Sequence, residues 1–337
     1  MATHRAVHVA SAGGALELVH VETVPPGPGH VRMDVAACGV CGTDHAFVNG
    51  VFPGLSWPVT PGHEIAGTVA EVGPGVEGVE VGERVVVGWF GGNCGHCARC
   101  RAGQLIHCLN GQIPSWHYPG GYAESVVVPA TALARIPDEL SFVEAAPMSC
   151  AGVTTYNALR RARAVPGDRV AVIGIGGLGH LALQFLNKWG CDVTAFTSSA
   201  SKADEARAMG AHHIVDTHSK DGLAAVAGTF DFIISTVNAN LDWDGYIGAL
   251  APKGHLHIVG VPPAPIPVSG FALLVAQRSV GGSPSGAPAT VATMLEFCAR
   301  HGIKPVTEQF AMSQANEAFA HLEAGKARYR IVLKNDL

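Results

Sequence analysis

Short apolar runs separated by glycine- and proline-rich segments characterise the chain up to about Ala145. The runs are rich in valine and bounded by turn residues, which is typical of β-strands. We expect strands at Val31–Ala37, Ile65–Val72, Arg84–Val87 and Ala123–Val128. Segments such as PPGPG and VGPGVEGVEVGE separate them as turns. This pattern predicts an antiparallel, barrel-like β domain.

After Ala145 the pattern changes to apolar strands that alternate with helical stretches. Such alternation predicts a parallel sheet with helices on both faces, in a second domain of the α/β class. The expected strands are Arg169–Ile173, Asp192–Thr197, His213–Val215, Phe230–Ser235 and His255–Val259. The expected helices between them are Gly177–Trp189, Ser201–Met209 and Asp242–Leu250. Beyond about Ala287 we expect two helices and a closing strand, at Thr290–Arg300, Ser313–Ala324 and Tyr329–Leu333.

Composition and charge narrow the class of protein. The 337 residues suffice for about two domains. With 48% apolar and 15% charged residues, the chain is globular and not disordered. The net charge of −5 and the lack of a basic run argue against a nucleic-acid partner or an anionic membrane.

We expect neither a secretory signal nor a membrane-spanning segment from the sequence. The opening MATHRAVHV has no apolar core of a secretory signal. The most apolar stretch, Val170–Leu186, is interrupted by glycines and His180 and is shorter than the ~18 residues of a membrane span. We therefore expect a cytoplasmic protein. In that reducing compartment, spaced cysteines serve as metal ligands or catalytic groups more often than as disulfides.

A glycine-rich turn follows the strand expected at Arg169–Ile173. Gly174, Gly176 and Gly179 form the pattern G-x-G-x-x-G between this strand and an apolar-periodic helix, which is the context of a dinucleotide-binding fingerprint. Gly174 permits the tight turn, Gly176 lets backbone amides approach a pyrophosphate, and Gly179 lets the helix pack close to the strand. A strand–helix turn without a ligand is the alternative.

The segment after the next strand bears on the choice of cofactor. An NAD enzyme has an acidic residue about 20 positions after the fingerprint, to bind the ribose 2′-hydroxyl. Here the first acid is Asp204, whereas Ser198 and Ser199 offer hydroxyl donors and Lys202 a positive charge. This pattern favours a 2′-phosphate and hence NADP(H). Ser201 is also suited to cap the following helix.

Four cysteines lie within a 15-residue loop. They are Cys94, Cys97, Cys100 and Cys108. Four thiolates so close together predict a structural, tetrahedral zinc site that orders a loop without a core of its own. An iron–sulfur cluster is the alternative, but its fourth spacing and following proline differ from this loop.

Three further candidate ligands are far apart in the sequence: Cys41, His63 and Cys150. Cysteine, histidine and cysteine form the ligand set of a catalytic zinc that keeps one position open. Asp44 is placed to bind the ring of His63 and fix its tautomer. We assign Thr43 to bridging the substrate oxygen and a ribose hydroxyl, and Glu64 to exchange of zinc-bound species.

Together these motifs resemble zinc-dependent medium-chain alcohol dehydrogenases, and among them the cinnamyl alcohol dehydrogenase group. The resemblance rests on CGVCGTD, PGHEIAGTVAEVG, the four-cysteine loop, GGYAE, CAGVTTY, the glycine turn and RYRIVL. The segments IGIGGLGH, CDVTAFTSS, TVNANLDW and GKARYRIVLK are especially similar to bacterial NADPH-dependent, broad-range aldehyde reductases.

The resemblance implies a GroES-like β-barrel catalytic domain of residues 1–146, completed by 288–337, and a Rossmann NADP-binding domain of residues 147–287. It implies two zinc ions per chain, NADP(H), and hydride transfer to a small-molecule aldehyde, with the alcohol as the reverse substrate. It also implies a homodimer, or a homotetramer, that assembles through the sheet edge near Gly260–Gly282. No nucleic acid or membrane partner is expected.

The resemblance also implies residue roles. The catalytic residues are Thr43, Asp44, His45 and Glu64. The cofactor-binding residues are Thr155, Gly174, Gly176, Gly177, Leu178, Gly179, Ser198, Ser199, Lys202, Thr236, Val237, Gly260, Val261 and Arg330. Two positions depart from many relatives, which have histidine at Gly42 and a proton-passing histidine at Ala46. Either His45 substitutes for the latter, or the proton passes from Thr43 through ribose to water.

Other interpretations of the same residues remain open at this point. A polyol or sugar dehydrogenase of the same fold is one, and a catalytically silent zinc- and nucleotide-binding scaffold is another. Apolar residues near the ligands are either a substrate wall or ordinary core, namely Trp57, Trp89, Phe90 and Trp116. The sequence leaves the identity of the aldehyde and the physiological direction open.

Overall fold

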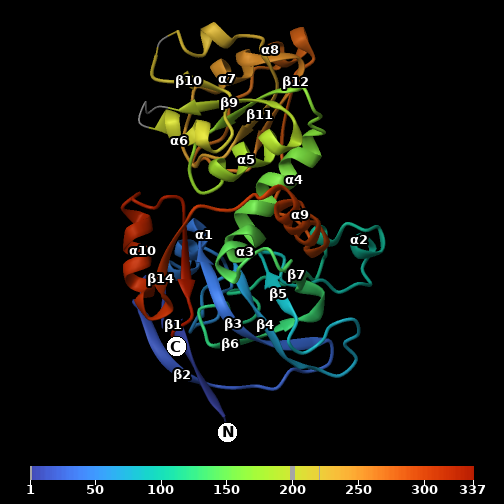
Figure 1. Cartoon of the computed structure of the whole chain (residues 1–337), viewed down its shortest axis with the longest axis vertical. Helices are drawn as coiled ribbons and strands as arrows, with labels where there is room; N and C mark the ends of the chain where they lie inside the picture. Colours follow the sequence, from blue (N-terminus) through green and yellow to red (C-terminus); the bar gives the residue numbers. More distant parts are fainter. Residues whose placement is uncertain (1, 198–201, 220) are drawn as a thin grey trace. The chain divides into compact units, whose positions relative to one another are not determined.

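The computed structural model describes residues 2–197, 202–219 and 221–337 (Figure 1). Ser198 and Ser199, which we assigned to cofactor binding, and the candidate cap Ser201 lie outside these residues. The chain divides into two compact units. The terminal unit joins Met1–Val153 with Gly286–Leu337, and the central unit is Thr154–Ser285. The domain limits expected from the sequence, at 146/147 and 287/288, stay a prediction.

The described part of the terminal unit is built on a sheet in the order β14–β15–β3–β4–β5–β7, with β6 paired to β3. Its strands are β3 (His30–Val40), β4 (Ile65–Val72), β5 (Arg84–Val87), β6 (Ser125–Pro129), β7 (Ala134–Arg135), β14 (Thr307–Ala311) and β15 (Arg330–Lys334). These strands pair antiparallel, except β14 with β15. Alternate residues of β3, such as Val31, Met33 and Val35, are buried, so one face of this central strand forms the core.

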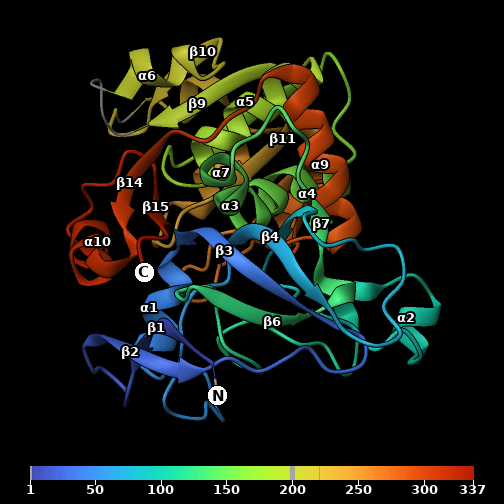
Figure 2. The same cartoon turned by 60° about the horizontal axis from the view of Figure 1, so that its bottom comes forward.

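A hairpin precedes this sheet in the chain. Strands β1 (Thr3–Val9) and β2 (Leu16–Glu22) pair antiparallel and lie side by side in Figure 2. Single bridges join β1 to the rest of the unit, between Ala6 and Ala123 and between Val9 and Val59. Ala123 makes only such a bridge, which is why the strand expected at Ala123–Val128 begins at Ser125.

Short helices of the terminal unit carry the candidate site residues. Helix α1 (Gly42–Val48) follows β3, and α3 (Phe142–Pro147) continues into a π-helical turn at Met148–Gly152. The remaining helices are α2 (Ala98–Arg101), α9 (Pro288–His301) and α10 (Ala315–Glu323), with 3₁₀ turns at Leu105–His107, Ala130–Ala132 and Met312–Gln314. Helix α10 packs beside β14 and β15 (Figure 1).

The central unit contains a six-stranded sheet in the order β10–β9–β8–β11–β12–β13. Its strands are β8 (Arg169–Ile173), β9 (Asp192–Thr197), β10 (His213–Asp216), β11 (Phe230–Ser235), β12 (Leu250–Ile258) and β13 (Ser279–Gly282). All the pairings in this sheet are parallel. Counted along the chain, the order is 3-2-1-4-5-6, that of a doubly wound sheet. Such sheets bind their ligands at the carboxyl ends of the two strands between which the order reverses, here β8 and β11.

The helices of the central unit connect these strands. They are α4 (Val153–Ala162), whose first residue belongs to the terminal unit, α5 (Gly179–Trp189), α6 (Ala203–Ala208), α7 (Trp243–Ala249) and α8 (Gly270–Ala276), with a 3₁₀ turn at Ala224–Val226. Helix α5 begins two residues after the expected Gly177 because Gly176–Leu178 form the turn that precedes it.

The apolar stretch Val170–Leu186 folds as most of β8, the glycine turn and the first part of α5. Within the described ranges, no helix has both the length and the apolar character to cross a membrane.

A chain of hydrogen bonds links β12 to β13 and the segment after it. His255 Nδ1 lies 2.8 Å from Ser279 Oγ, and His255 Nε2 lies 3.1 Å from His257 Nδ1. His257 Nε2 completes the chain at 2.9 Å from Ser283 Oγ. Two neutral imidazoles satisfy all three bonds. Burial lowers the pKa of His257 to about 4, and nearby His255 and Arg161 act in the same direction.

This lowered pKa predicts a pH-dependent stability. A histidine of the unfolded chain has a pKa of about 6.5, so as the pH falls the unfolded chain takes up this proton first. We expect the contribution of His257 to the free energy of unfolding to be complete above about pH 6.5 and to decline towards about pH 4. Urea unfolding at several pH values measures it, and a His257→Gln variant should show a shallower decline. Parallel pH profiles for both proteins would contradict the assignment.

Candidate functional site

The loop from the end of β3 into α1 positions Cys41 and Asp44. The backbone N–H of Cys41 donates to Asp44 Oδ2 at 2.8 Å, which closes the first turn of α1. The carboxylate of Asp44 is fully buried and also accepts from the backbone N–H of Gly62 at 3.3 Å. Tyr122 OH lies 3.4 Å from Asp44 Oδ2. Asp44 therefore connects α1 to the segment that carries His63.

His63 is fully buried, and its ring is held from one side. Nδ1 lies 2.9 Å from Asp44 Oδ1, whereas Nε2 has no hydrogen-bond partner within the described part of the chain. Burial lowers the pKa of His63, but the charge and hydrogen bond of Asp44 outweigh it and raise that pKa well above its ordinary value. The raised pKa means that a metal ion would displace the proton from Nε2, while the proton on Nδ1 stays bound to Asp44 and fixes the tautomer of the ligating ring.

Cys150 comes from a different part of the terminal unit. It lies in the π-helical turn Met148–Gly152, a local irregularity that frequently occurs at functional sites. Ser149 anchors this turn, because its hydroxyl donates to the carbonyl of Ala146 at 2.7 Å. At Gly88 a side chain is excluded, because a Cβ there would lie 2.2 Å from the carbonyl oxygen of Ser149.

These segments bring four potential metal ligands together. They are Cys41, His63, Glu64 and Cys150, whose ligand atoms all lie within 4.8 Å of one another. A hydrogen bond from Cys150 lowers the pKa of Cys41 well below that of a free thiol, with His63 and Arg330 contributing, although burial opposes the shift. Two thiols, one of them ready to ionise, and an unpartnered imidazole nitrogen fit zinc.

Glu64 and Arg330 form a buried ion pair beside this cluster. Arg330 Nη2 donates to Glu64 Oε1, and the two side chains are 6% and 0% exposed, respectively. Burial raises the pKa of Glu64 to about 7, although Arg330 acts in the opposite direction. Arg330, expected to contact the cofactor, therefore lies in β15 with its guanidinium bound to Glu64. Glu64 Oε2 and Arg330 Nε have no partner among the residues described.

The two remaining catalytic candidates lie on α1. Thr43 Oγ1 is 3.6 Å from Cys41 Sγ. His45 Nδ1 lies 3.0 Å from Glu323 Oε1 of α10, and the His45 ring is 4.5 Å from that of Phe319. Thr43 is thus close to a candidate ligand, whereas His45 faces α10.

An aromatic wall leads away from His63. The ring of Trp89 meets that of His63 edge-on at 5.5 Å, and Phe52 lies 6.0 Å from Trp89 and 4.9 Å from Trp116. Sequence reasoning named Trp89 and Trp116 but missed Phe52, because this residue stands in a loop that contains glycine and proline and has no periodicity. Trp57, by contrast, packs against the hydrophobic core of the terminal unit.

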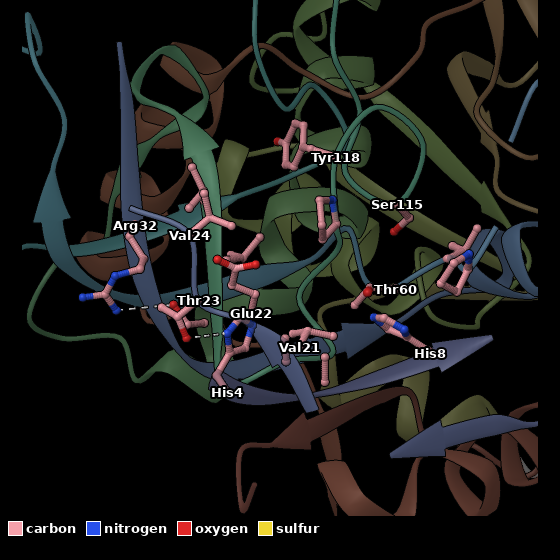
Figure 3. A pocket seen from close by; sticks show the side chains of 18 of the residues that line it. His4, His8, Val21, Glu22, Thr23, Val24, Arg32, Thr60, Ser115 and Tyr118 are labelled. Atoms are coloured by element: carbon pink, nitrogen blue, oxygen red, sulfur yellow. Dashed lines mark hydrogen bonds between the residues drawn. The ribbon is translucent and has the colours of Figure 1, made fainter. Parts of the chain in front are cut away.

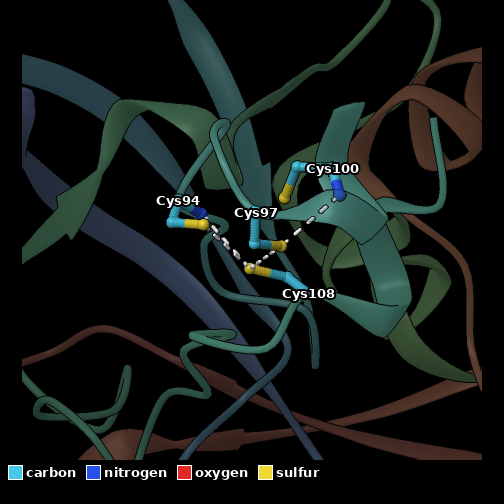
Figure 4. A group of neighbouring side chains, drawn as sticks. All are labelled: Cys94, Cys97, Cys100 and Cys108. Carbon is cyan, nitrogen blue, oxygen red and sulfur yellow. Dashed lines mark hydrogen bonds between the residues drawn. The ribbon is translucent and has the colours of Figure 1, made fainter. Parts of the chain in front are cut away.

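The four-cysteine loop forms a second cluster in the terminal unit (Figure 4). Cys108 Sγ lies 3.6 Å from Cys94 Sγ and 4.0 Å from Cys97 Sγ. Backbone N–H groups donate to these sulfurs, as Cys94 N–H does to Cys108 Sγ at 3.3 Å. The backbone N–H groups of His96 and Cys97 lower the pKa of Cys94 to about 5. Burial raises the pKa of Cys100 to about 12, so metal binding would displace its proton. Four sulfurs gathered so closely fit a closed, tetrahedral zinc site.

The glycine turn of the central unit has the geometry of a phosphate-binding loop. Gly174 has a φ of 86°, and a Cβ on Gly179 would lie 1.8 Å from the carbonyl oxygen of Gly174. A Cβ on Gly176 would meet nothing within 4 Å, so the backbone there borders open space. Helix α5 begins at Gly179, directly after this turn, and a helix N-terminus is a favourable place for an anion.

Other predicted cofactor residues gather around the same turn. Thr236 Oγ1 donates to the carbonyl of Gly174 at 2.8 Å, and a Cβ on Gly174 would strike Val237. Gly260 lies so close to Val237 that a Cβ there would be 2.1 Å from the Val237 carbonyl oxygen. Val261 donates its N–H to Asn238 Oδ1 at 2.7 Å. Of the other predicted residues, Gly177 and Leu178 lie in the turn, and Thr155 is buried in α4.

A cavity of about 570 Å³ opens beside the turn and lies wholly in the central unit. Lys202 lines it, with Nζ 3.5 Å from the carbonyl oxygen of Ile175. Thr217, His218 and Asn240 also line it and were missed by sequence reasoning, because no motif marks the ends of these loops.

Another cavity, of about 460 Å³, lies in the terminal unit, and no cysteine is among its lining residues (Figure 3). Residues of the β1–β2 hairpin, β6 and the loop around Ser115 line it, with His4, His8 and Thr60 among them. None of the predicted catalytic, metal-binding or cofactor-binding residues lines this cavity, but Trp116, a candidate for the substrate wall, does.

Comparisons with known proteins agree with this geometry. Residues 27–138 match the alcohol dehydrogenase GroES-like domain, and residues 177–300 match the zinc-binding dehydrogenase family. The aldehyde reductase AdhA of Synechocystis sp. is 46% identical over 324 residues, which cover 96% of each chain. The chain belongs to the zinc-binding, medium-chain alcohol dehydrogenases.

Two other relatives extend the comparison across the family. The NADP-dependent alcohol dehydrogenase C 1 of Mycolicibacterium smegmatis is 38% identical and covers 99% of this chain and 98% of its own. A cinnamyl alcohol dehydrogenase of Sorghum bicolor has a TM-score of 0.92 at 32% identity, covering 99% of this chain and 98% of that one. The resemblance and the fold class expected from the sequence, a GroES-like domain with a Rossmann sheet, are therefore confirmed.

The contacts of Asp44 predict a measurable effect on this zinc alcohol dehydrogenase. An Asp44→Asn variant cannot provide a negative charge to His63 Nδ1, so we expect zinc affinity to fall about 10- to 100-fold. Competition with a chelator, followed by metal analysis, measures the change. Asp34→Asn is the matched control, because Asp34 pairs with Arg32 on the surface. Equal zinc retention in both variants would refute this role of Asp44.

Proposed function

We propose that the chain transfers hydride reversibly between NADP(H) and an aldehyde or primary alcohol, and acts as a zinc-dependent, broad-range aldehyde reductase. The observation that carries the proposal is the cluster in which the half-buried Cys41 and Cys150 lie close to buried His63, whose Nε2 has no hydrogen-bond partner among the described residues. The names of the relatives, an aldehyde reductase and an NADP-dependent alcohol dehydrogenase, support the same activity.

Three residues would hold the catalytic zinc, namely Cys41, His63 and Cys150. Zinc would supply a Lewis acid for the carbonyl oxygen, and NADPH would supply the hydride. Asp44 keeps the proton on Nδ1 of His63 and so directs Nε2 towards the metal. We assign Thr43 Oγ1, near the sulfur of Cys41, to delivering a proton to the substrate oxygen and accepting it in the reverse reaction.

We propose that Glu64 is an additional carboxylate ligand that binds the metal only during exchange of substrate and water. Its free Oε2 lies in the ligand cluster, while Arg330 binds Oε1 and offsets part of the cost of its burial. Exchange of substrate and water at the metal would be assisted by a carboxylate at this distance.

A second zinc is proposed for Cys94, Cys97, Cys100 and Cys108, which makes two ions per chain. All four coordination positions would be filled by thiolates, so this site has no room for a substrate. Its function is to stabilise the loop, in which few residues are buried.

We propose NADP(H) rather than NAD(H) as the cofactor, because the cavity of the central unit contains a positive charge. Lys202 lines this cavity, and no acidic residue stands at the end of β9, the position that selects the ribose hydroxyls of NAD. Ser198 and Ser199 remain proposed ligands of the 2′-phosphate. An NADPH preference favours the reductive direction. A homodimer and a cytoplasmic location also stay proposals.

The assignment of Cys41 as a zinc ligand predicts a variant that still binds NADPH but no longer turns over substrate. Cys41→Ser should bind NADPH normally, because the glycine turn lies in the central unit, but should lose turnover by about a hundredfold or more. NADPH fluorescence titration and steady-state assays measure the two properties. Cys191→Ser is the control, because that thiol lies in the central unit and donates to the Val165 carbonyl. Wild-type reduction rates in Cys41→Ser would overturn the assignment.

The charge of Lys202 predicts the cofactor preference. A charge-assisted hydrogen bond is worth about 1.5–3 kcal/mol, so Lys202→Ala should lower the preference for NADPH over NADH by about tenfold or more. Ratios of kcat/KM for the two cofactors with the same aldehyde measure this change. Lys188→Ala, at an exposed position in α5, is the control. Faster turnover of the wild-type enzyme with NADH would show that the argument from Lys202 is mistaken.

A further inference from the structure

The cavity of about 460 Å³ in the terminal unit has no part in the proposed function. Its volume lies within the range of about 300–1,000 Å³ that is usual for small-molecule sites. The β1–β2 hairpin forms one side of it, and strand β6 and the loops around Val59 and Ser115 form the others (Figure 3). A space of this size that the side chains around it leave unfilled is a candidate binding site, because protein interiors are otherwise closely packed.

Apolar side chains make up much of the lining. Val59 and Val126 are 3% and 4% exposed, and both are part of the buried interior of the terminal unit. The half-buried side chains of Val21 and Trp116 line the same space. An apolar molecule that enters the cavity is therefore removed from water, which favours its binding.

The charged side chains of the lining leave no buried charge for a charged ligand. Arg32 already donates to Asp34 at 3.0 Å and to Glu71 at 3.3 Å, and it lies on the opposite side of the cavity from Ser115 (Figure 3). Glu22 is exposed to solvent, so its carboxylate disfavours an anion but is not a buried partner for a cation.

The histidines of the lining are also poor partners for an ion. Burial lowers the pKa of His4 and of His8, although Glu124 opposes the shift of His4, so both rings are neutral at neutral pH. His4 Nδ1 lies 3.0 Å from Thr23 Oγ1. The exposed His117 accepts from the backbone N–H of Ile113 through Nδ1 at 3.1 Å. The lining therefore fits an uncharged molecule.

Ser115 provides one specific polar contact. It is 5% exposed, and its Oγ is the only buried side-chain polar atom of the lining that lacks a hydrogen-bond partner in the part of the chain described. Figure 3 shows its hydroxyl directed towards the side of the cavity where Thr60 lies. A buried hydroxyl without a partner is unfavourable, so an oxygen atom of a ligand would satisfy it.

Trp116 belongs both to this cavity and to the aromatic wall. Its ring lies 4.9 Å from that of Phe52, which lies 6.0 Å from Trp89. The ring of Trp89 in turn meets that of His63 at 5.5 Å. A molecule in the cavity therefore contacts a side chain whose neighbours lead, ring by ring, to a candidate metal ligand.

We propose that this cavity binds an uncharged, mainly apolar molecule with a hydroxyl or carbonyl oxygen, and that the bound molecule alters the aromatic wall through Trp116. The oxygen of the ligand bonds to Ser115 Oγ, and its apolar part contacts Val59 and Trp116. A shift of the Trp116 ring moves Phe52, so an occupied cavity changes the KM for the aldehyde more than kcat. Binding is independent of the proposed function, whereas the effect on KM rests on it.

The first experiment measures binding of 2-naphthol to the zinc-loaded enzyme by isothermal titration calorimetry. This aromatic alcohol is uncharged at neutral pH, and the carbon that bears its hydroxyl has no hydrogen to lose as hydride. His8→Trp puts a larger ring into the cavity from a β-strand, where tryptophan is well tolerated, and should raise the Kd about tenfold or more. His20→Trp is the matched control, because His20 is an exposed residue of the same hairpin that does not line the cavity.

A second variant tests the polar contact. Ser115 has a φ of 71°, which glycine adopts readily, so Ser115→Gly removes the hydroxyl and keeps the backbone of the loop. Loss of one hydrogen bond should raise the Kd for 2-naphthol about three- to tenfold. The proposed site is refuted if 2-naphthol does not bind the wild-type enzyme, or if it binds His8→Trp and Ser115→Gly as tightly as the wild type.

The second experiment measures aldehyde reduction with NADPH in the presence and absence of 2-naphthol. We expect 2-naphthol to change KM about twofold or more in the wild type and in His20→Trp, and to have no effect in His8→Trp. A compound that competes for the zinc site would raise KM equally in all three proteins, and this result would overturn the coupling through Trp116. Failure of the proposed function is separate, since the wild type would then reduce no aldehyde while calorimetry still reports on the cavity.

Discussion

The candidate zinc site depends on one buried carboxylate, that of Asp44. It accepts hydrogen bonds from the Cys41 backbone, the Gly62 backbone and His63 Nδ1, so two ligand-bearing segments are fixed by a single side chain. A buried charge of this kind is favourable only when its hydrogen bonds are all made. The positions of Cys41 and His63 are therefore coupled, and neither can shift without breaking bonds to the same carboxylate. Cys150 is fixed independently, by the π-helical turn and its contact with Gly88.

Much of this architecture could be predicted from local sequence pattern. Strands β4, β5, β8, β9 and β11 have the expected bounds, because each is a short, mostly apolar run with turn residues on its flanks. The two sets of metal ligands and the glycine turn were found because their chemistry restricts residue type and spacing. The family and the fold are established, whereas the roles assigned to individual side chains remain proposals.

The rest depends on contacts between residues far apart in the chain, which leave no local pattern. Phe52 lies in a glycine-containing loop, yet it joins Trp89 to Trp116 in space. The pairing of His45 with Glu323 spans most of the sequence, and the π-helical turn at Met148–Gly152 follows an ordinary helix start. The hairpin β1–β2 was also not foreseen, since exposed and half-buried residues of β2 obscure its alternation.

The ion pair of Glu64 with Arg330 has a consequence for how the enzyme is made. Its partners are 266 residues apart, and Arg330 lies in the last strand, β15, which pairs with β3. A ribosome synthesises Cys41, His63 and Cys150 long before it reaches Arg330, so a nascent chain holds Glu64 without its counter-charge. The metal cluster therefore reaches its final electrostatic state only when synthesis is nearly complete, and a chain truncated before β15 would carry all three ligands without it.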